Sequence, residues 1–530
     1  MSRDPALPIT RRVMNLSGIL TQAATRFPDR RGLSQGDLGW TWREIEARVG
    51  RAAEGLRRLG VGKGDPVIVQ SKNCLEMFES MFACFRIGAV WAPTNFRLTP
   101  PEVAEIAARC EAKAILCHAA FPEHAAALAD ALPEAPTVWI GGAPDGCLAY
   151  DALLTSAEGR TAKPEPVEYD DPCWFFFTSG STAAPKAAVL THGQMAFVIA
   201  NHLADLFPGT DETDVSLVVA PLSHGAGVHQ LVMAARGAES VLLPGDGLDP
   251  EGAWELVEAR RVTNIFTVPT IVNALVASDA VDRVYHGSLK YVVYAGAPMY
   301  RADQVRALEK LGPVLVQYFG LGEVTGNITV LPPAYHTIDD AAMRVGSCGF
   351  ARTGMQIAVM DEAGRALEPF ETGEICVCGP AVFAGYHRNE AANRKAFRDG
   401  WFRTGDLGHL DAEGFLYITG RASDMYISGG SNIYPREIEE KLLTHPAVAE
   451  CAVVGVPDPK WGEVGAAAIV LEPGTGLQAD ELLGWLDGRI ARYKRPRYVA
   501  FWEALPKSGY GKVTKKAVRE ALIARGEAPQ

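Results

Sequence analysis

Hydrophobic and polar positions follow two different periods along the chain, and the change of period divides it into regions. From Trp40 to about Val138, helical stretches such as WREIEARVGRAAEGLRRLG alternate with short apolar runs such as DPVIVQ and KAILCH. The alternation returns from Phe175 to about Val330, with the apolar runs SLVVAP, SVLLP, NIFTVP, LKYVVYAG and VLVQYFG. Short apolar runs separated by helices are typical of largely parallel sheets with crossover helices. The pattern predicts two α/β layers up to about residue 335.

From about residue 340 to 420 the pattern changes to short alternating strands separated by glycine turns, as in GMQIAVMDEAG and GEICVCG. This alternation predicts a small antiparallel β unit. After Gly420 the chain returns to mixed helix and strand patterns, for example REIEEKLLTH and AECAVVGV. We therefore expect an α/β protein with a large N-terminal domain, residues 1–420, and a small, mobile α+β C-terminal domain, residues 421–530.

The composition favours a multidomain globular protein that handles small molecules. With 48% hydrophobic and 22% charged residues, the chain of 530 residues has ample apolar surface to bury and no sign of disorder. The net charge of −12 argues against general electrostatic attraction to nucleic acid or to an anionic membrane. No apolar run approaches the roughly 20 residues of a membrane-spanning helix, and the N-terminal apolar stretch is too short for a signal peptide.

The 10 cysteines indicate a reducing, cytoplasmic setting, because they occur mostly singly within apolar runs. Cys376 and Cys378 form the one close pair. Their segment GEICVCG alternates like a strand and lacks a partner cluster at metal-ligand spacing. We expect two buried strand cysteines there and no metal site.

The sharpest local signal is TSGSTAAPK, residues 178–186, directly after the apolar run CWFFF. Hydroxyl groups, backbone N–H groups beside glycine and one lysine on a turn after a strand are suited to holding a polyphosphate. The spacing differs from G-x-x-x-x-G-K-[ST], which disfavours a Walker-type NTPase. Taken alone, the segment fits a Ser/Thr-rich surface turn equally well.

Three further segments carry chemistry only in combination. In QYFGLGE, residues 317–323, an aromatic ring beside glycines can stack on a purine, and the carboxylate of Glu323 can hold Mg²⁺. Asp406 in WFRTGD can accept ribose hydroxyls with Arg421 nearby, although a turn residue after glycine is the plainer interpretation. The segment LPKSGYGK, residues 505–512, fits a solvated tail loop when taken alone.

Seven motifs in this order resemble those of the adenylate-forming superfamily, which contains acyl-CoA synthetases, peptide-synthetase adenylation domains and insect luciferases. They are TSGSTAAPK, PLSHGAG, YAGAPM, QYFGLGE, WFRTGDLG, GRASDMYISGGSNIYPREIE and LPKSGYGKVTKK, and the resemblance runs from about residue 15 to 520. It implies an AMP-forming acid:CoA ligase that uses ATP, Mg²⁺ and coenzyme A. Such an enzyme makes an acyl-AMP and pyrophosphate from a carboxylic acid and ATP, and then passes the acyl group to the thiol of CoA.

The resemblance also implies roles for individual residues of the nucleotide site. The phosphates would be held by the hydroxyl-rich loop and its lysine: Thr178, Ser179, Gly180, Ser181, Thr182 and Lys186. The adenine would lie between the segment Gly296, Ala297 and Pro298 and the ring of Phe319, within Gln317, Tyr318, Phe319 and Gly320. Glu323 would bind Mg²⁺, Asp406 the ribose hydroxyls, and Arg421 would assist at ribose or phosphate. Lys512 would reach from the C-terminal domain to the carboxylate and α-phosphate, and with Lys186, His224 and Glu323 it would form the catalytic set.

A second set of implied roles concerns the step that uses CoA. Asp424 matches the hinge about which the C-terminal domain swings between an adenylating and a thioester-forming pose. In the second pose Ser428, Gly429 and Gly430 would line the tunnel for the pantetheine arm of CoA. His224 matches the histidine between the acid pocket and that tunnel. A lone histidine in an apolar stretch is otherwise usually structural.

The chain departs from the usual motifs at a few positions. Ala183 and Ala187 replace two glycines of the phosphate loop, and alanine would be strained wherever a positive φ is required. Phe319 stands where tyrosine is common and Gly322 where threonine is usual, which removes a hydroxyl. We expect a slower or more selective enzyme from these changes, because Lys186, Glu323, Asp406 and Lys512 are all present.

By analogy with related ligases, the acid pocket would be formed by His224, Ala226, Gly227, Gln230, Tyr294, Ala295, Leu321 and Gly322. Most of these residues are small and leave room for a ring or a medium chain, while Gln230 and Tyr294 could pair with a polar substituent. The segment PLSHGAG lacks the aspartate that holds the ammonium group in amino-acid-activating relatives, so an amino-acid substrate is disfavoured. An aromatic or medium-chain carboxylic acid is expected.

Three other functions share these motifs. A luciferase-like oxygenase is not favoured, since the chain ends in Glu-Ala-Pro-Gln and not in a peroxisomal address. An acyl-AMP ligase that delivers to a carrier protein would be unable to use free CoA. A non-catalytic nucleotide-binding regulator would explain the altered loop and Gly322, although Glu323 and Lys512 argue against it. By family analogy we expect a homodimer.

Overall fold

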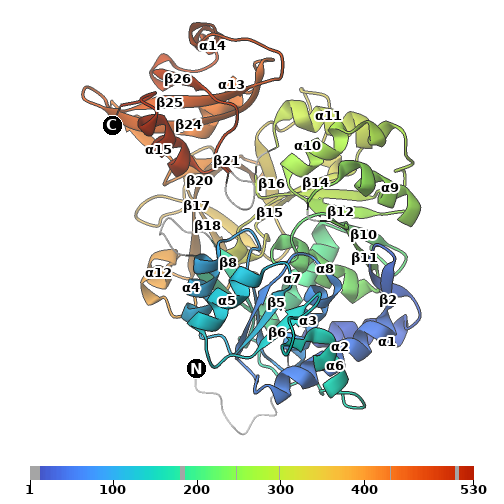
Figure 1. The fold of residues 1–530 in the computed structure, drawn as a ribbon. Helices are drawn as coiled ribbons and strands as arrows, with labels where there is room; N and C mark the ends of the chain where they lie inside the picture. Colours follow the sequence, from blue (N-terminus) through green and yellow to red (C-terminus); the bar gives the residue numbers. More distant parts are fainter. Residues whose placement is uncertain are drawn as a thin grey trace.

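The computed structural model describes residues 12–178, 185–245, 247–297, 299–429, 431–507 and 513–529. Within these ranges the chain forms three β-sheets of seven, fourteen and five strands. Figure 1 shows the first two sheets and their helices in one large body, coloured blue to yellow, with the five-stranded sheet in a smaller orange-to-red body beside it. The predicted α/β class with a large N-terminal and a small C-terminal domain is confirmed.

The seven-stranded sheet contains the first predicted layer, and DPVIVQ and KAILCH are its strands β3 and β5. Its order is β7-β6-β5-β3-β4-β8-β9, parallel except for the β8–β9 pair. The strands are β3 (Pro66–Gln70), β4 (Val90–Pro93), β5 (Ala114–His118), β6 (Thr137–Ile140), β7 (Leu148–Ala149), β8 (Pro172–Thr178) and β9 (Lys186–Thr191). The helices that precede or connect them are α2 (Trp42–Arg58), α3 (Leu75–Arg86), α4 (Pro100–Cys110), α5 (Pro122–Ala131) and α6 (Tyr150–Ser156).

The fourteen-stranded sheet joins the second predicted layer to the antiparallel unit, which sequence analysis treated as separate. Strands β10 to β14 are parallel, and β15 pairs antiparallel with both β14 and β16, so the sheet continues without a break. Its first half is β1 (Arg31–Gln35), β2 (Leu38–Thr41), β10 (Val215–Val218), β11 (Glu239–Leu242), β12 (Asn264–Thr267), β13 (Tyr291–Tyr294) and β14 (Leu315–Phe319). The antiparallel half is β15 (Thr329–Leu331), β16 (Ser347–Ala351), β17 (Gln356–Met360), β18 (Gly373–Cys378), β19 (Phe397–Arg398), β20 (Trp401–Leu410) and β21 (Phe415–Arg421).

The helices of this second region connect its strands and pack on its faces. They are α1 (Ser17–Arg26), α7 (His192–Asp205), α8 (Gly225–Arg236), α9 (Pro250–Arg260), α10 (Pro269–Ala277), α11 (Arg301–Leu311) and α12 (Glu390–Ala396). The helix α7 begins at a capping box in which the Thr191 side chain accepts from the backbone N–H of Gln194. This satisfies a backbone donor that the first turn of a helix leaves unpaired.

The five-stranded sheet makes up the C-terminal body. Its elements are β22 (Tyr426–Ser428), β23 (Ser431–Ile433), β24 (Val448–Asp458), β25 (Gly462–Leu471), β26 (Tyr498–Phe501), α13 (Pro435–Leu442), α14 (Ala479–Trp485) and α15 (Lys515–Ala524). Lys515 on α15 pairs with Glu439 on α13 and donates to the carbonyl oxygen of Val453 on β24, so three elements share one buried charge pair. The last strand of the large sheet ends at Arg421 and β22 begins at Tyr426, which places the change of sheet close to the predicted boundary.

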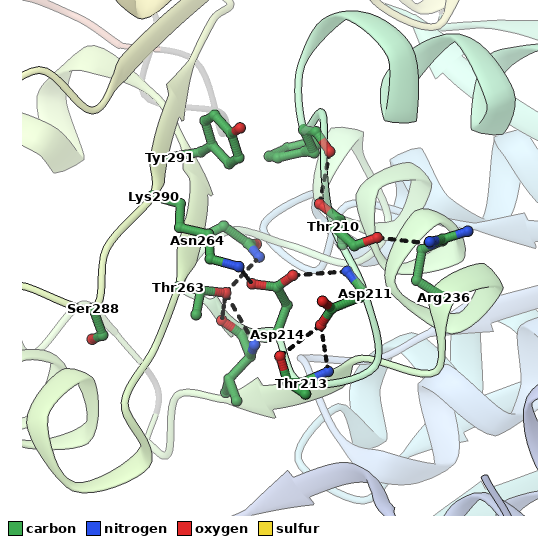
Figure 2. A network of polar contacts seen from close by, with 12 residues as sticks. Thr210, Asp211, Thr213, Asp214, Arg236, Thr263, Asn264, Ser288, Lys290 and Tyr291 are labelled. Carbon is green, nitrogen blue, oxygen red and sulfur yellow. Dashed lines mark hydrogen bonds and ion pairs between the residues drawn. The ribbon is translucent and has the colours of Figure 1, made fainter.

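A network of polar contacts ties the amino ends of the parallel strands together (Figure 2). Asp214, just before β10, is buried, forms an ion pair with Lys290 at 2.7 Å, and accepts from the backbone N–H of Asp211 at 2.9 Å. The Thr263 hydroxyl, just before β12, donates to the carbonyl oxygen of Val215 at 3.1 Å. These contacts hold the strand starts in register, and the opposite, carboxyl ends are left for the site.

The described residues bear on the expectations for membrane spans and for the close cysteine pair. No helix there is long and apolar enough to cross a membrane. Cys376 on β18 is buried and Cys378 is half-buried, and the described part of the chain holds no group of three or more His, Cys, Asp or Glu side chains arranged to bind a metal. Burial raises the pKa of the Cys376 thiol to about 11, which keeps it protonated and unreactive at neutral pH.

Candidate active site

A cavity of about 2310 Å³ opens at the carboxyl ends of the parallel strands. Ala220 after β10, Thr267 at the end of β12, Ala295 after β13 and Gly320 after β14 all line it. Ligands of open α/β sheets bind at this edge, because the loops that follow the strands converge there. The cavity is therefore the candidate active site.

Glu323 is the central polar residue of the described site. It lies in a short 3-10 turn, Gly322–Val324, directly after β14, and its side chain is buried while lining the cavity. The hydroxyls of Thr178 and Tyr386 both donate to its Oε1 at 2.9 Å. These two donors, from β8 and from the loop after β18, hold the carboxylate in one orientation.

Tyr386 was missed by the sequence analysis, although it follows a glycine in the segment AGYHR. Besides binding Glu323, its ring lies 4.7 Å from Nζ of Lys186, a cation–π contact that positions the lysine. Burial and the Glu323 carboxylate raise the pKa of Tyr386 well above its usual value, so its hydroxyl remains a donor. Because this loop lies far from the phosphate-loop motif in sequence, only the fold brings Tyr386 to Lys186 and Glu323.

The Glu323 carboxylate fits a Mg²⁺ ligand. Both hydroxyl donors reach the same oxygen, Oε1, and no described residue hydrogen-bonds to Oε2. Carboxylate oxygen is the donor type that Mg²⁺ prefers, and sites that also bind nucleotide phosphates need few protein ligands. Glu323 therefore has the chemistry to hold the ion together with substrate phosphates.

Two of the departures from the usual motifs have a structural reason or consequence. A Cβ at Gly322 would lie 2.5 Å from the ring of Phe176 and 2.9 Å from Cγ2 of Thr178, so a larger residue would displace the strand that carries Thr178. Ala187 lies within the extended strand β9 and is absent from the residues with positive φ. The strain expected at Ala187 is therefore not found, because its backbone suits any residue.

The residues predicted for adenine fall on two sides of the cavity wall. Gly296, Ala297 and Gly320 line the cavity, as does Tyr318. The remaining two predicted positions, Gln317 and Phe319, are half-buried and do not line it. Alternate residues of β14 point to opposite faces, so the face that carries Tyr318 looks into the cavity.

The predicted ribose residues meet at the junction of the two domains. Asp406 on β20 is buried, and its Oδ1 accepts from Nε of Arg421 at 3.2 Å across the β20–β21 pair. Arg421 lines the cavity, and so do Gly405 and Leu407 on either side of Asp406, but Asp406 does not itself line it. The carboxylate is thus held by an arginine at the cavity edge.

The acid pocket is formed by some of its predicted residues and not by others. His224, Ala226, Ala295, Leu321 and Gly322 line the cavity. The His224 ring packs at 4.5 Å on the ring of Phe176.

The other three predicted acid-pocket residues, Gly227, Gln230 and Tyr294, lie behind the wall. Gln230 accepts from the Ser240 hydroxyl at 2.6 Å, and the Tyr294 hydroxyl contacts Nε2 of His336 at 2.9 Å. Their polar groups are thus used inside the protein. The position of a residue within a motif therefore did not show whether its side chain faces the cavity or the protein interior.

The C-terminal domain presents one particular side to the cavity. Asp424, in the turn after β21, lines it, together with Lys507 and Val513. Ser428 and Gly429, at the tip of the β22–β23 hairpin, do not line it, and the Gly429 backbone N–H donates to the carbonyl of Trp461 at 2.9 Å. The segments that flank the predicted catalytic lysine therefore face the nucleotide side, and the predicted CoA loop does not.

Some predicted site residues lie outside the described residues. They are Ser179, Gly180, Ser181, Thr182, Pro298, Gly430 and Lys512, as well as the departure at Ala183. Their roles stay predictions.

The comparisons with known proteins agree with this geometry. The family model described as "AMP-binding enzyme" matches residues 20–387, and the model "AMP-binding enzyme C-terminal domain" matches residues 437–512. The chain belongs to the AMP-binding enzyme family. This AMP-binding enzyme is 36% identical over 502 residues to a feruloyl-CoA synthase of an Amycolatopsis species, covering 94% of this chain and 96% of the relative. It is 34% identical to an indoleacetate–CoA ligase of Aromatoleum aromaticum, covering 95% and 96%.

Solved structures show the same likeness. The AMP-binding enzyme is 29% identical to the o-succinylbenzoate CoA synthetase of Bacillus subtilis in complex with its acyl-adenylate, with a TM-score of 0.83 over 96% of this chain and 99% of that one. It is 25% identical to an anthranilate CoA ligase in complex with anthranoyl-AMP, with a TM-score of 0.88 over 98% and 99%. The AMP-binding enzyme is thus an AMP-forming acid:CoA ligase that uses ATP, CoA and Mg²⁺.

Proposed function

We propose that this ligase activates an aromatic carboxylic acid, and that the residues of the described cavity perform both half-reactions. The supporting observation is that one cavity contains both a polar cluster and a region lined by aromatic rings. The cluster consists of Glu323, Thr178, Tyr386 and Lys186. The rings of Phe266 and Tyr318 are stacked at 5.9 Å beside small residues, a shape that suits a planar substrate. The names feruloyl-CoA synthase and indoleacetate–CoA ligase of two relatives, and the anthranoyl-AMP bound to a structural neighbour, each contain an aromatic acid, which agrees with this shape.

In the first half-reaction a carboxylate oxygen of the acid attacks the α-phosphorus of ATP, and the bond to the bridging oxygen breaks to release pyrophosphate. Two anions must approach, so the main task of the protein is to neutralise charge in a site that excludes water. Lys186 faces the phosphates, held by its contact with the Tyr386 ring. Lys512 would balance charge at the α-phosphate, and Glu323 would hold Mg²⁺, which would supply positive charge to the phosphates.

In the second half-reaction the sulfur of CoA attacks the acyl carbon, and AMP leaves. For this step the hairpin that contains Ser428 and Gly429 would have to reach the cavity. Rotation of the C-terminal domain about Asp424 would bring it there and would move the segment around Lys507 and Val513 away. Lys507 and Val513 line the cavity, whereas Ser428 and Gly429 do not. His224, at the start of α8, lines the cavity and would lie between the acid and the thiol.

A panel of acids tests the proposed substrate class. The enzyme is incubated with Mg·ATP, CoA and matched aromatic and medium-chain acids, and acyl-CoA and AMP are measured together. We expect acyl-CoA from arylpropenoic or arylacetic acids with a kcat/KM at least tenfold above that of octanoate. A reversed order contradicts the aromatic assignment. Acyl-AMP without a thioester indicates a carrier-protein acceptor instead.

Replacing Glu323 by glutamine tests the cluster at the phosphates. The amide keeps the shape but loses the negative charge, so we expect adenylation to fall by about 100-fold or more and the Mg²⁺ concentration for half-maximal rate to rise. Pyrophosphate release across a Mg²⁺ titration measures both. Glu239→Gln is the control, since Glu239 accepts from the Ser34 hydroxyl at 2.8 Å at the amino end of β11 and does not line the cavity. Equal losses in the two variants would contradict the role of Glu323.

Three further properties stay predictions. We expect a cytoplasmic enzyme that forms homodimers and has no nucleic-acid partner. The net charge of −12 supports the last of these. Light scattering on the purified chain measures its mass in solution and decides between monomer and dimer.

A further inference from the structure

The inner part of the acid pocket contains a phenol without a protein partner. The Tyr318 side chain lines the cavity and is 9% exposed, and no described residue forms a hydrogen bond with its hydroxyl. The ring is held from two sides, because a Cβ on Gly326 would lie 2.5 Å from it and a Cβ on Gly225 would lie 3.4 Å from its Oη. Buried hydroxyls are nearly always hydrogen-bonded, so this one is expected to bind a group that enters the cavity.

His202 on α7 is a second such group. Its side chain is 2% exposed and also lines the cavity. Its Nδ1 lies 3.2 Å from Nη2 of Arg352 and 3.0 Å from the carbonyl oxygen of Val198. A carbonyl oxygen can only accept, so Nδ1 carries the proton of the neutral ring and donates to Val198, which leaves Nε2 as an acceptor. No described residue bonds to Nε2.

Arg352 connects the two groups and also limits what they can bind. It lies beside His202, donates to Oδ1 of Asn327 at 2.9 Å and lies near Tyr318. Its charge is balanced by Asp205, at 3.6 Å. Burial and Arg352 lower the pKa of His202 well below its usual value, so the imidazole stays neutral. This end of the pocket is therefore polar but carries no net charge to attract a second carboxylate.

We propose that the Tyr318 hydroxyl and the unprotonated Nε2 of His202 form a hydrogen-bonding end of the acid pocket, and that they select an aromatic acid with a phenol on its far side, whose oxygen accepts from Tyr318 and whose O–H donates to Nε2. The inference rests on the proposed function and specifies its substrate.

The test compares 4-hydroxycinnamate with 4-methylcinnamate, which have nearly the same shape and differ in hydrogen bonding. We expect wild-type enzyme to favour the hydroxy acid at least tenfold in kcat/KM, because a site built around a hydrogen bond rejects the analogue that lacks it. In Tyr318→Phe the ratio should fall about tenfold. That variant removes one oxygen with no protein partner, so the fold is retained. His202→Gln, whose amide oxygen can still accept a hydrogen bond, should preserve more of the ratio than His202→Leu.

Tyr291→Phe is the matched control, since the Tyr291 hydroxyl donates to Pro208 at the opposite end of the strands. A merely structural defect lowers turnover of both acids together and leaves the ratio unchanged, which would overturn the inference. Equal turnover of the two acids by wild-type enzyme would also overturn it, while leaving the aromatic ligase intact. A preference for 4-carboxycinnamate would replace the neutral oxygen by an anion and would likewise overturn it. Absence of product with every acid contradicts the proposed function itself.

Discussion

Lys512→Ala is expected to abolish adenylation while leaving most of the transfer from preformed acyl-AMP to CoA. Lys512 directly precedes Val513 in the chain, and Val513 lines the cavity. Val513 also pairs with Lys507 in an isolated antiparallel β-bridge. In the proposed mechanism the lysine is the one charge that the C-terminal domain supplies to the α-phosphate. Removing a charge that stabilises a transition state costs about 100- to 1000-fold in rate.

The two half-reactions are measured separately to test this expectation. Pyrophosphate release from acid and ATP reports adenylation, and acyl-CoA formation from synthetic acyl-AMP reports transfer. We expect the first to fall by at least 100-fold and the second by less than fivefold. Lys441→Ala on α13 is the matched control, because it is an exposed lysine of the same domain that does not line the cavity. Equal loss of both half-reactions would contradict the two-pose mechanism.

The second large effect concerns stability in acid. Four histidines are buried in the large domain: His192, His202, His229 and His336. Burial lowers the pKa of His192, His229 and His336 to about 4 and that of His202 well below its usual value. The unfolded chain binds these protons near pH 6.5, whereas the folded protein does not until about pH 4. The unfolded state therefore gains protons first as the pH falls.

The free energy of unfolding should consequently decrease on acidification between about pH 6.5 and pH 4, by up to about 1.4 kcal/mol per pH unit for each histidine. Thermal unfolding of the large domain between pH 7.5 and pH 5 measures the effect as a falling Tm. His229→Gln, which keeps an amide for the contact with Asn264, removes one titrating group and should reduce the slope. A Tm that does not change over this range would contradict the expectation.

Much of the site was accessible from the sequence because each motif is a contiguous segment that follows a strand. The strand and the loop after it are neighbours in the chain, so the positions of Thr178, Lys186 and Glu323 at the carboxyl edge follow from the pattern of apolar runs. The same reasoning could not find Tyr386 or His202. Both reach the cavity through contacts with residues 63 to 150 positions away in the chain.

The sequence also could not decide which side of an element faces the cavity. Gln230 and Tyr294 are in the right motifs but bond inside the wall, whereas Tyr318 lines the cavity. In a strand or a helix the direction of a side chain depends on what packs against each face. A pattern that is apolar on both faces does not distinguish them.

By itself, the sequence determined the α/β class, the alternation of helices and strands in the two layers, the small C-terminal domain and the family chemistry. These follow from local periodicity and from motifs that act through neighbouring residues. The tertiary structure decided three other matters: the continuation of the parallel sheet into the antiparallel strands, the orientation of the Glu323 carboxylate by Thr178 and Tyr386, and the polar inner end of the acid pocket. Each depends on contacts between segments distant in the chain, and such contacts form only when burial of the common core brings those segments together.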